Sequence, residues 1–277
     1  MTIEASIADH YTTAGLLERI TDALRASGVD SAAATAEDLQ PVDEFHIGGV
    51  LAIRDLVAPL RLTPEMHVLD VGSGLGGTAR FVAGQTGARV TGLDVTPAFV
   101  ETAAALSAMV NMAGQTTFSA GSALDMPFED DRFDVALMVH VGMNIGDKPR
   151  LMAEAARVLK PGGTFAIYDV MKTGPDPIDV PVPWADRLDI SFLASLEDYR
   201  AAATSSGFVE LAARGRADFA LRVFAAQRQR VEAEGPPVLG IHLLLGATGA
   251  DKIENMVANV SSGRIAPTEL ILRWDGS

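Results

Sequence analysis

Residues 68–77, VLDVGSGLGG, decide how this chain is expected to fold. Glycines at positions 72, 74 and 77 match the pattern G-x-G-x-x-G of dinucleotide-binding loops. Glycines at 72, 74 and 76, with Asp70 two residues before the first, match a second kind of nucleotide loop. The stretch therefore predicts a strand, a glycine turn and a helix. It leaves two ligands open: NAD, or a molecule that keeps the adenosine but lacks the pyrophosphate.

Short β-rich runs alternate with helical patterns from Met66 onward. One expected helix begins at Pro97 after the N-cap Thr96, and another is capped by Ser195. Strands are expected at 66–71, 88–93, 116–119, 133–139, 164–168, 209–213 and 269–273. This alternation predicts the α/β class, as a doubly wound, mostly parallel, seven-stranded Rossmann-like sheet with helical cap segments.

Helical segments are expected before the sheet and between its last two strands, so we predict a single domain with a covered ligand edge. Helices are expected at 14–26 and from Gly48 to 60, with an acidic link between them. Closely spaced prolines predict a loop over 170–194. The expected parts are an N-terminal helical cap (1–60), a cofactor-binding core (61–214), a helical insert over the pocket (215–265) and a last strand (266–277).

Charge and composition argue against several classes of partner. The formal net charge of −14 disfavours nucleic acid and anionic membrane surfaces as partners. Proteins bind both of these mainly through positively charged lysine and arginine side chains. The chain has no cysteine, which removes disulfides and thiolate chemistry. Its start lacks a signal-peptide pattern, and its apolar segment 238–249 is too short to span a bilayer. We therefore expect a cytoplasmic protein that binds a small molecule. Whether it forms a homodimer is left open.

Two carboxylates stand where the first two predicted strands end. Asp94 lies where a carboxylate can accept hydrogen bonds from both hydroxyls of an adenosine ribose, although an aspartate before Thr-Pro can also simply start a turn. Asp94 fits both candidate ligands. Asp70 would repel the pyrophosphate of NAD and suits a cation, such as the ammonium of a methionine moiety.

Three later stretches complete an ordered series: 121–128 (GSALDMPF), 132–135 (RFDV) and 159–163 (LKPGG). Over residues 40–214 this series resembles the class I S-adenosylmethionine-dependent methyltransferases. The stretches 43–49 (DEFHIGG) and 140–145 (HVGMNI) look like those of the small-molecule branch, which includes sarcosine/dimethylglycine-like and coclaurine-like N-methyltransferases. The resemblance implies a methyltransferase with S-adenosyl-L-methionine as cofactor and S-adenosyl-L-homocysteine as product.

The same resemblance implies which residues hold the cofactor. The glycine loop would carry the methionine end, Asp94 the ribose, and Ser122 and Ala123 the adenine. Many relatives have an acidic residue at the position of Ser122, so Asp125 is an alternative for the adenine contact. Tyr11 is similar to lid aromatics that close over the cofactor. The implied cofactor-binding residues are Tyr11, Asp70, Gly72, Ser73, Gly74, Gly76, Asp94, Val95, Ser122, Ala123 and His140.

The catalytic residues follow from what methyl transfer requires. The enzyme must align the acceptor with the methyl group, exclude water and, for an acidic acceptor, supply a base. A neutral amine needs no strong base, and we predict a nitrogen acceptor rather than an oxygen acceptor. His140, which the resemblance places beside the sulfonium, and His46 are the predicted catalytic residues. The predicted substrate pocket consists of Phe45, Met143, Asn144, Tyr168, Trp184 and His242.

Two other functions compete with this prediction, and a metal site is disfavoured. Asn144, Asp147 and Asp169 are too scattered to predict a metal ion. An NAD-linked oxidoreductase is the competing enzyme class, which Asp70 and the later stretches disfavour. A non-catalytic S-adenosylmethionine-binding protein is the competing class without turnover, and no feature of the sequence excludes it.

Overall fold

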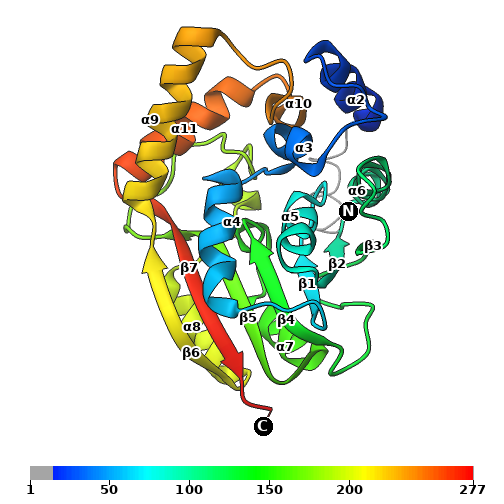
Figure 1. Ribbon diagram of the computed structural model, residues 1–277. Helices are drawn as coiled ribbons and strands as arrows, with labels where there is room; N and C mark the ends of the chain where they lie inside the picture. Colours follow the sequence, from blue (N-terminus) through cyan, green and yellow to red (C-terminus); the bar gives the residue numbers. More distant parts are fainter. Residues whose placement is uncertain (1–14, 277) are drawn as a thin grey trace.

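Seven strands form one sheet in the order β3-β2-β1-β4-β5-β7-β6, as Figure 1 shows for the computed structural model. The structure describes residues 15–276. The strands are β1 (His67–Val71), β2 (Arg89–Asp94), β3 (Thr116–Ala120), β4 (Phe133–Val139), β5 (Leu159–Lys172), β6 (Phe208–Gly215) and β7 (Ile265–Trp274). Strands β1 to β5 pair in parallel, and β7 runs antiparallel between β5 and β6. The predicted mostly parallel, seven-stranded sheet is confirmed.

Helices pack on both faces of the sheet, which explains why its central strands are apolar throughout. One face is covered by α4 (Gly49–Val57) and α5 (Gly77–Thr86), the other by α7 (Lys148–Val158) and α8 (Leu196–Ser205). Helix α6 (Pro97–Met109) follows β2. Thr96 is its N-cap residue, as predicted, but the Thr96 side chain makes no capping hydrogen bond. The predicted cap at Ser195 is confirmed, because its hydroxyl accepts from the Asp198 N–H.

Strand β5 is longer than the predicted 164–168. It begins at Leu159 and therefore includes the Pro161-Gly162-Gly163 segment. It also continues to Lys172, inside the expected loop. The long antiparallel pairing with β7, from Thr164 opposite Arg273 to Lys172 opposite Ile265, extends the C-terminal end of the strand, and a local pattern does not reveal such a partner. At the other end, Leu159 pairs with Phe133 of β4.

The remaining helices gather at one end of the sheet, opposite the C-terminus (Figure 1). They are α2 (Leu16–Ala26), α3 (Ala36–Asp43), α9 (Ala217–Glu234), α10 (His242–Leu245) and α11 (Gly249–Ser261). Leu16 and Leu39 of this cap pack in one apolar cluster with Leu75 and Phe99, which lie beside the carboxyl edge of the sheet. The cap therefore adjoins the edge where ligands of such sheets bind.

One detail of the prediction needs correction, and another stays untested. The acidic link between the first two predicted helices contains α3, which a capping box of Thr35 and Asp38 begins. Short turns are η1 (Ala58–Leu60), η2 (Gly142–Asn144) and η3 (Leu188–Ile190). Within residues 15–276, no helix combines the length and apolar character that crossing a bilayer requires. The division into cap, core and insert stays a prediction.

Candidate active site

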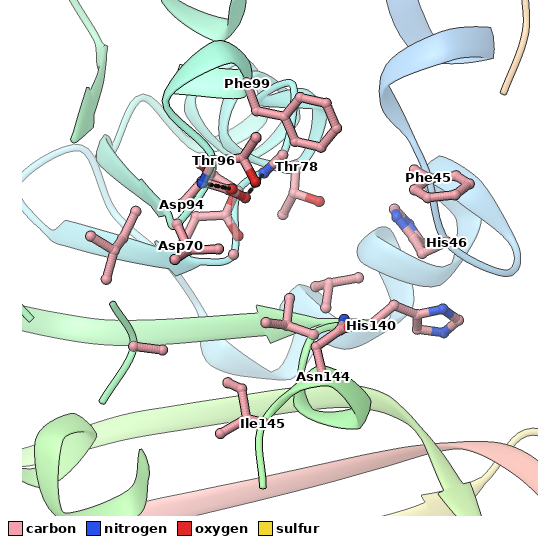
Figure 2. A pocket seen from close by; sticks show the side chains of 18 of the residues that line it. Phe45, His46, Asp70, Thr78, Asp94, Thr96, Phe99, His140, Asn144 and Ile145 are labelled. Atoms are coloured by element: carbon pink, nitrogen blue, oxygen red, sulfur yellow. Dashed lines mark hydrogen bonds between the residues drawn. The ribbon is translucent and has the colours of Figure 1, made fainter. Parts of the chain in front are cut away.

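A cavity of about 300 Å³ lies at the carboxyl ends of β1, β2 and β4. Figure 2 shows Asp70 and Asp94 on one side of it and Phe45, His46 and His140 on the other. The structure thus brings most of the predicted site residues together. Those that line the cavity are Phe45, His46, Asp70, Gly72, Ser73, Gly74, Asp94, Val95, Ala123, His140 and Asn144.

The glycine loop follows β1 and turns with left-handed backbone angles at Gly72 (φ 74°) and Gly76 (φ 82°). A Cβ at Gly72 would lie 2.3 Å from a methyl group of Val141, so only glycine fits between the loop and the chain after β4. A Cβ at Gly76 would lie 2.6 Å from the Phe118 ring. Gly76 packs inward and is not among the residues that line the cavity, which contrasts with its predicted contact with the cofactor.

Asp94 is held in place by the backbone around it. The Gly74 N–H donates to Oδ2 at 2.8 Å and the Thr96 N–H donates to Oδ1 at 2.9 Å. Burial raises the pKa of Asp94, and these hydrogen bonds oppose the rise. Each carboxylate oxygen can still accept another hydrogen bond. Asp94 can therefore receive two neighbouring hydroxyl groups without rearranging.

Asp70 is only 1% exposed, and its Oδ2 has no hydrogen-bond partner within the described part of the chain. Burial, followed by the negative charge of Asp94, raises the pKa of Asp70 to about 7. A buried acceptor without a partner is costly. A cationic donor in the cavity would both satisfy this oxygen and favour its ionised form.

Asp43 also lines the cavity, and sequence reasoning missed it as a separate site residue. It ends α3 and forms a buried ion pair with Arg80 of α5, whose Nη2 donates to Oδ2 at 2.5 Å. The same Nη2 donates to the Leu75 carbonyl at 2.6 Å. Burial raises the pKa of Asp43, and the Arg80 charge opposes the rise. This pair ties the cap to the glycine loop.

Glu44 and His46 form a second buried pair in the same segment. Their Oε2 and Nε2 atoms are 3.3 Å apart, and His46 Nε2 also lies 3.2 Å from the Gly49 carbonyl. A carbonyl can only accept, so the geometry assigns the ring proton to Nε2 and leaves Nδ1 as the acceptor. Burial lowers the pKa of His46 to about 4. Burial, then the charges of Asp43 and Asp70, raises the pKa of Glu44 well above its usual value.

His140 directly follows β4 in a left-handed conformation (φ 54°), which is uncommon for a residue other than glycine. Its N–H donates to the Tyr168 carbonyl at 2.7 Å, and its ring centroid lies 5.0 Å from that of Tyr168. Nε2 has no partner within the described residues. Burial lowers the pKa of His140 well below its usual value, and His46 lowers it further. Both imidazoles are therefore neutral at neutral pH.

A smaller cavity of about 70 Å³ shares Phe45, His46 and His140 with the first. Met143 and Trp184 of the predicted substrate pocket line this smaller cavity. Sequence reasoning missed the rest of its wall, because those residues come from distant segments: Pro183, Ile241, Ile253 and Met256. The two histidines and Phe45 thus separate two adjoining spaces.

The turn after β4 rests on a buried polar pair. The Tyr199 hydroxyl donates to Asp169 Oδ2 at 2.5 Å, and the Val170 N–H donates to Oδ1 at 2.9 Å. A Cβ at Gly142 would lie 2.0 Å from the Tyr199 hydroxyl, so the turn packs directly on this pair. Asp169 lines neither cavity and instead supports this turn from below the surface. Burial raises its pKa to about 6.

Three further predicted residues, and the alternative Asp125, line neither cavity. Tyr168 is buried, and its hydroxyl donates to the Ile47 carbonyl at 3.0 Å instead of lining a cavity. The Ser122 hydroxyl accepts from the Leu124 N–H at 3.0 Å, and Ser122 lines neither cavity, nor does the largely exposed Asp125. His242 begins α10, where Ile241 and Leu244 reach the cavities in its place. Tyr11 lies outside the described residues.

Comparison with known proteins assigns residues 69–167 to a family described as "Methyltransferase domain". An O-methyltransferase, resE, of Aspergillus sclerotiorum is 32% identical over 48% of this chain and 51% of its own length. A sterol 4-C-methyltransferase, strm-1, of Caenorhabditis elegans is 37% identical over 41% and 34%. A glycine/sarcosine/dimethylglycine N-methyltransferase of Actinopolyspora halophila is 28% identical over 60% and 30%. The chain spans about half or less of the length of these relatives.

Solved structures extend the likeness to most of the chain. A structure described as a candidate sarcosine dimethylglycine methyltransferase from Galdieria sulphuraria is 25% identical, with a TM-score of 0.66 over 82% of this chain and 85% of that one. A geranyl diphosphate C-methyltransferase from Streptomyces coelicolor A3(2) is 16% identical and matches the fold with a TM-score of 0.70 over 99% and 98%. The chain therefore contains a methyltransferase domain and has the class I fold of S-adenosylmethionine-dependent methyltransferases.

Proposed function

We propose that the larger cavity binds S-adenosylmethionine and that the protein transfers its methyl group to a small-molecule acceptor. The observation that carries this proposal is the buried Asp70 Oδ2, which has no partner among residues 15–276 and lies beside a glycine loop and below Asp94 (Figure 2). These groups match an α-ammonium and a ribose diol, both present in this cofactor. A pyrophosphate would meet the Asp70 carboxylate instead, so the cavity disfavours the NAD-linked alternative. When bound, S-adenosylmethionine supplies a methyl group already activated on a sulfonium.

The protein's own residues would then bind the cofactor, orient the acceptor and exclude water. Asp70 would hold the ammonium, Asp94 the ribose, and the backbone of Gly72 to Gly74 the methionine chain. Phe45, His46 and His140, which line both cavities, would border the place where the methyl group meets the acceptor and would exclude water from it. His46 and His140 would orient the acceptor, through Nδ1 and Nε2 respectively. A cytoplasmic location and a homodimer stay predictions from the sequence.

We propose nitrogen as the methylated atom, although the curated relatives include N-, O- and C-methyltransferases. Burial lowers the pKa of both histidines far below that of a phenol or an alcohol, so neither is well matched to deprotonate an oxygen acceptor. A neutral amine needs no such step. The carboxyl groups of Asp43, Glu44 and Asp70 would also favour the positive charge that an amine acquires.

The cofactor proposal is tested by thermal unfolding with and without ligand. S-adenosylhomocysteine at a hundred times its dissociation constant should stabilise the protein by about 2.7 kcal/mol, and NAD should not. Asp94→Asn, which keeps the shape of the side chain, should remove most of this stabilisation while leaving the unliganded midpoint within a few degrees. A shift with NAD and none with S-adenosylhomocysteine would contradict the proposal.

The nitrogen proposal is tested by S-adenosylhomocysteine formation with two acceptors of similar size, phenethylamine and para-ethylphenol. We expect faster turnover with the amine, most clearly at alkaline pH where more of it is neutral. The phenol is the control for apolar fit alone. Faster turnover with the phenol at neutral pH would make oxygen the methylated atom.

A further inference from the structure

We propose that the acceptor is a molecule with an apolar body and no anionic group. This inference rests on the proposed function and adds the chemical class of the substrate. It concerns the smaller cavity, beyond the wall of Phe45, His46 and His140, and the part of the larger cavity that adjoins it.

The smaller cavity is apolar apart from the two neutral imidazoles. Met143, Pro183 and Trp184 line it from the segment after β4 and the proline-rich loop. Ile241, Ile253 and Met256 complete it from the helical insert, and Trp184 and Met256 are both buried. The indole N–H of Trp184 does not serve the cavity, because it donates to the Ser191 hydroxyl at 2.9 Å. Such a wall stabilises a ligand by burying its hydrocarbon surface.

No lysine or arginine lines either cavity in the described residues. The sequence of residues 1–14 also contains neither lysine nor arginine. A buried carboxylate or phosphate needs a positive partner or several hydrogen bonds. The chain offers an anionic acceptor no such partner here.

Three cations in segments that border the cavities are engaged elsewhere. Lys148 donates to the carbonyls of Ile145 and Phe192. Lys252 of α11 pairs with Asp186 at 3.1 Å, although its neighbour Ile253 lines the smaller cavity. Arg80 is bound to Asp43, as described above. An anionic acceptor would have to break one of these contacts.

Buried carboxyl groups on the other side of the wall add to this discrimination. Asp43 and Asp70 line the larger cavity, and Glu44 lies next to His46. All three are buried, and each has at least one carboxyl oxygen without a hydrogen-bond partner within the described part of the chain. Their unpartnered oxygens suit a donor such as an amine or its ammonium form, and any of these groups that is ionised repels an anion. Glycine, sarcosine and geranyl diphosphate are the compounds named for its relatives, and each carries an anionic group. The cavities described here lack the positive partner that such a group requires.

The test compares pairs of related ligands of which one carries an anionic group and the other does not, on protein saturated with S-adenosylhomocysteine. The pairs are phenylalaninamide and phenylalanine, sarcosinamide and sarcosine, and geraniol and geranyl diphosphate. Calorimetry should give a dissociation constant lower by more than about tenfold for the member of each pair that lacks the anionic group. Equal or tighter binding of the anionic members would overturn the inference. So would a failure of all members without an anionic group to bind.

A variant with a cation in the smaller cavity supplies the matched control. Met256→Lys should reverse or abolish the preference within the phenylalanine pair, and its thermal shift with S-adenosylhomocysteine reports whether it is folded. Met143→Lys repeats the test with a lysine placed in the segment after β4. An unchanged preference in both folded variants would show that charge in this cavity does not select the acceptor. A wild-type protein without any such thermal shift would overturn the proposed function, and this inference with it.

Discussion

Asp70 shows how strongly a single residue depends on its surroundings. An exposed aspartate is ionised at neutral pH, whereas burial beside Asp94 raises the pKa of Asp70 to about 7. The carboxyl group is therefore close to half protonated under ordinary conditions. A cationic ligand must bind the ionised form, so binding expels a proton in this range.

The affinity for S-adenosylhomocysteine should thus depend on pH. Below the pKa of Asp70 in the free protein, each pH unit lost should weaken binding by up to about tenfold, as measured by calorimetry from about pH 5 to pH 7. Burial also raises the pKa of Asp94, which adds to the slope.

Asp70→Asn separates the two carboxylates. This variant should bind more weakly at pH 7, and its affinity should vary less with pH than that of the wild type. A variant that keeps the full pH dependence would assign the effect to Asp94 or another group.

The residues of the site differ in how far the sequence reveals them. Asp70 and Asp94 are predictable because they end strands next to a glycine loop, a local pattern with a clear physical reason. Asp43 is not, since its role depends on Arg80, 37 positions away and buried in the middle of α5. Nothing in the local sequence marks that arginine as buried.

At the level of elements, the Asp43–Arg80 pair joins helix α3 of the cap to helix α5 of the core. Both side chains are 1% exposed, so solvent does not screen the interaction. Removing one partner leaves an uncompensated charge in the interior, which typically costs more than the intact pair contributes.

Arg80→Ala should lower the free energy of unfolding by about 3–5 kcal/mol, measured by urea denaturation. Arg25→Ala is the matched control, because Arg25 pairs with Asp22 within α2 at 68% and 73% side-chain exposure. That change should cost less than about 1 kcal/mol. Similar losses in both variants would mean that the buried pair does not hold the cap.

The elements also show why their limits were harder to predict than their existence. Periodicity indicates the strands and most helices, but β5 extends to Lys172 because β7 pairs with it from a distance, and at its other end Leu159 lies opposite Phe133 of β4. Helix α3 escaped prediction because its sequence is acidic and contains Pro41. The spacing of Thr35 and Asp38 was the available signal, since a capping box begins many helices.

For the whole molecule, the glycine loop and strand alternation were enough to predict the sheet, its mostly parallel order and the cavity at its carboxyl edge. The walls of that cavity were less predictable. Phe45 and His46 come from the chain before β1, Trp184 from the proline-rich loop, and Met256 from the insert. Only the folded chain brings these segments together, and the composition of the smaller cavity emerges at that scale.

The wall shared by the two cavities also has a thermodynamic consequence. Two molecules that touch the same three side chains, Phe45, His46 and His140, do not bind independently, because the first to arrive fixes rotamers that the second would otherwise have to order. The resulting cooperativity is reciprocal: whatever factor the cofactor product applies to acceptor affinity, the acceptor applies to the product. An acceptor that binds more tightly to the loaded protein would for the same reason slow the departure of the spent cofactor.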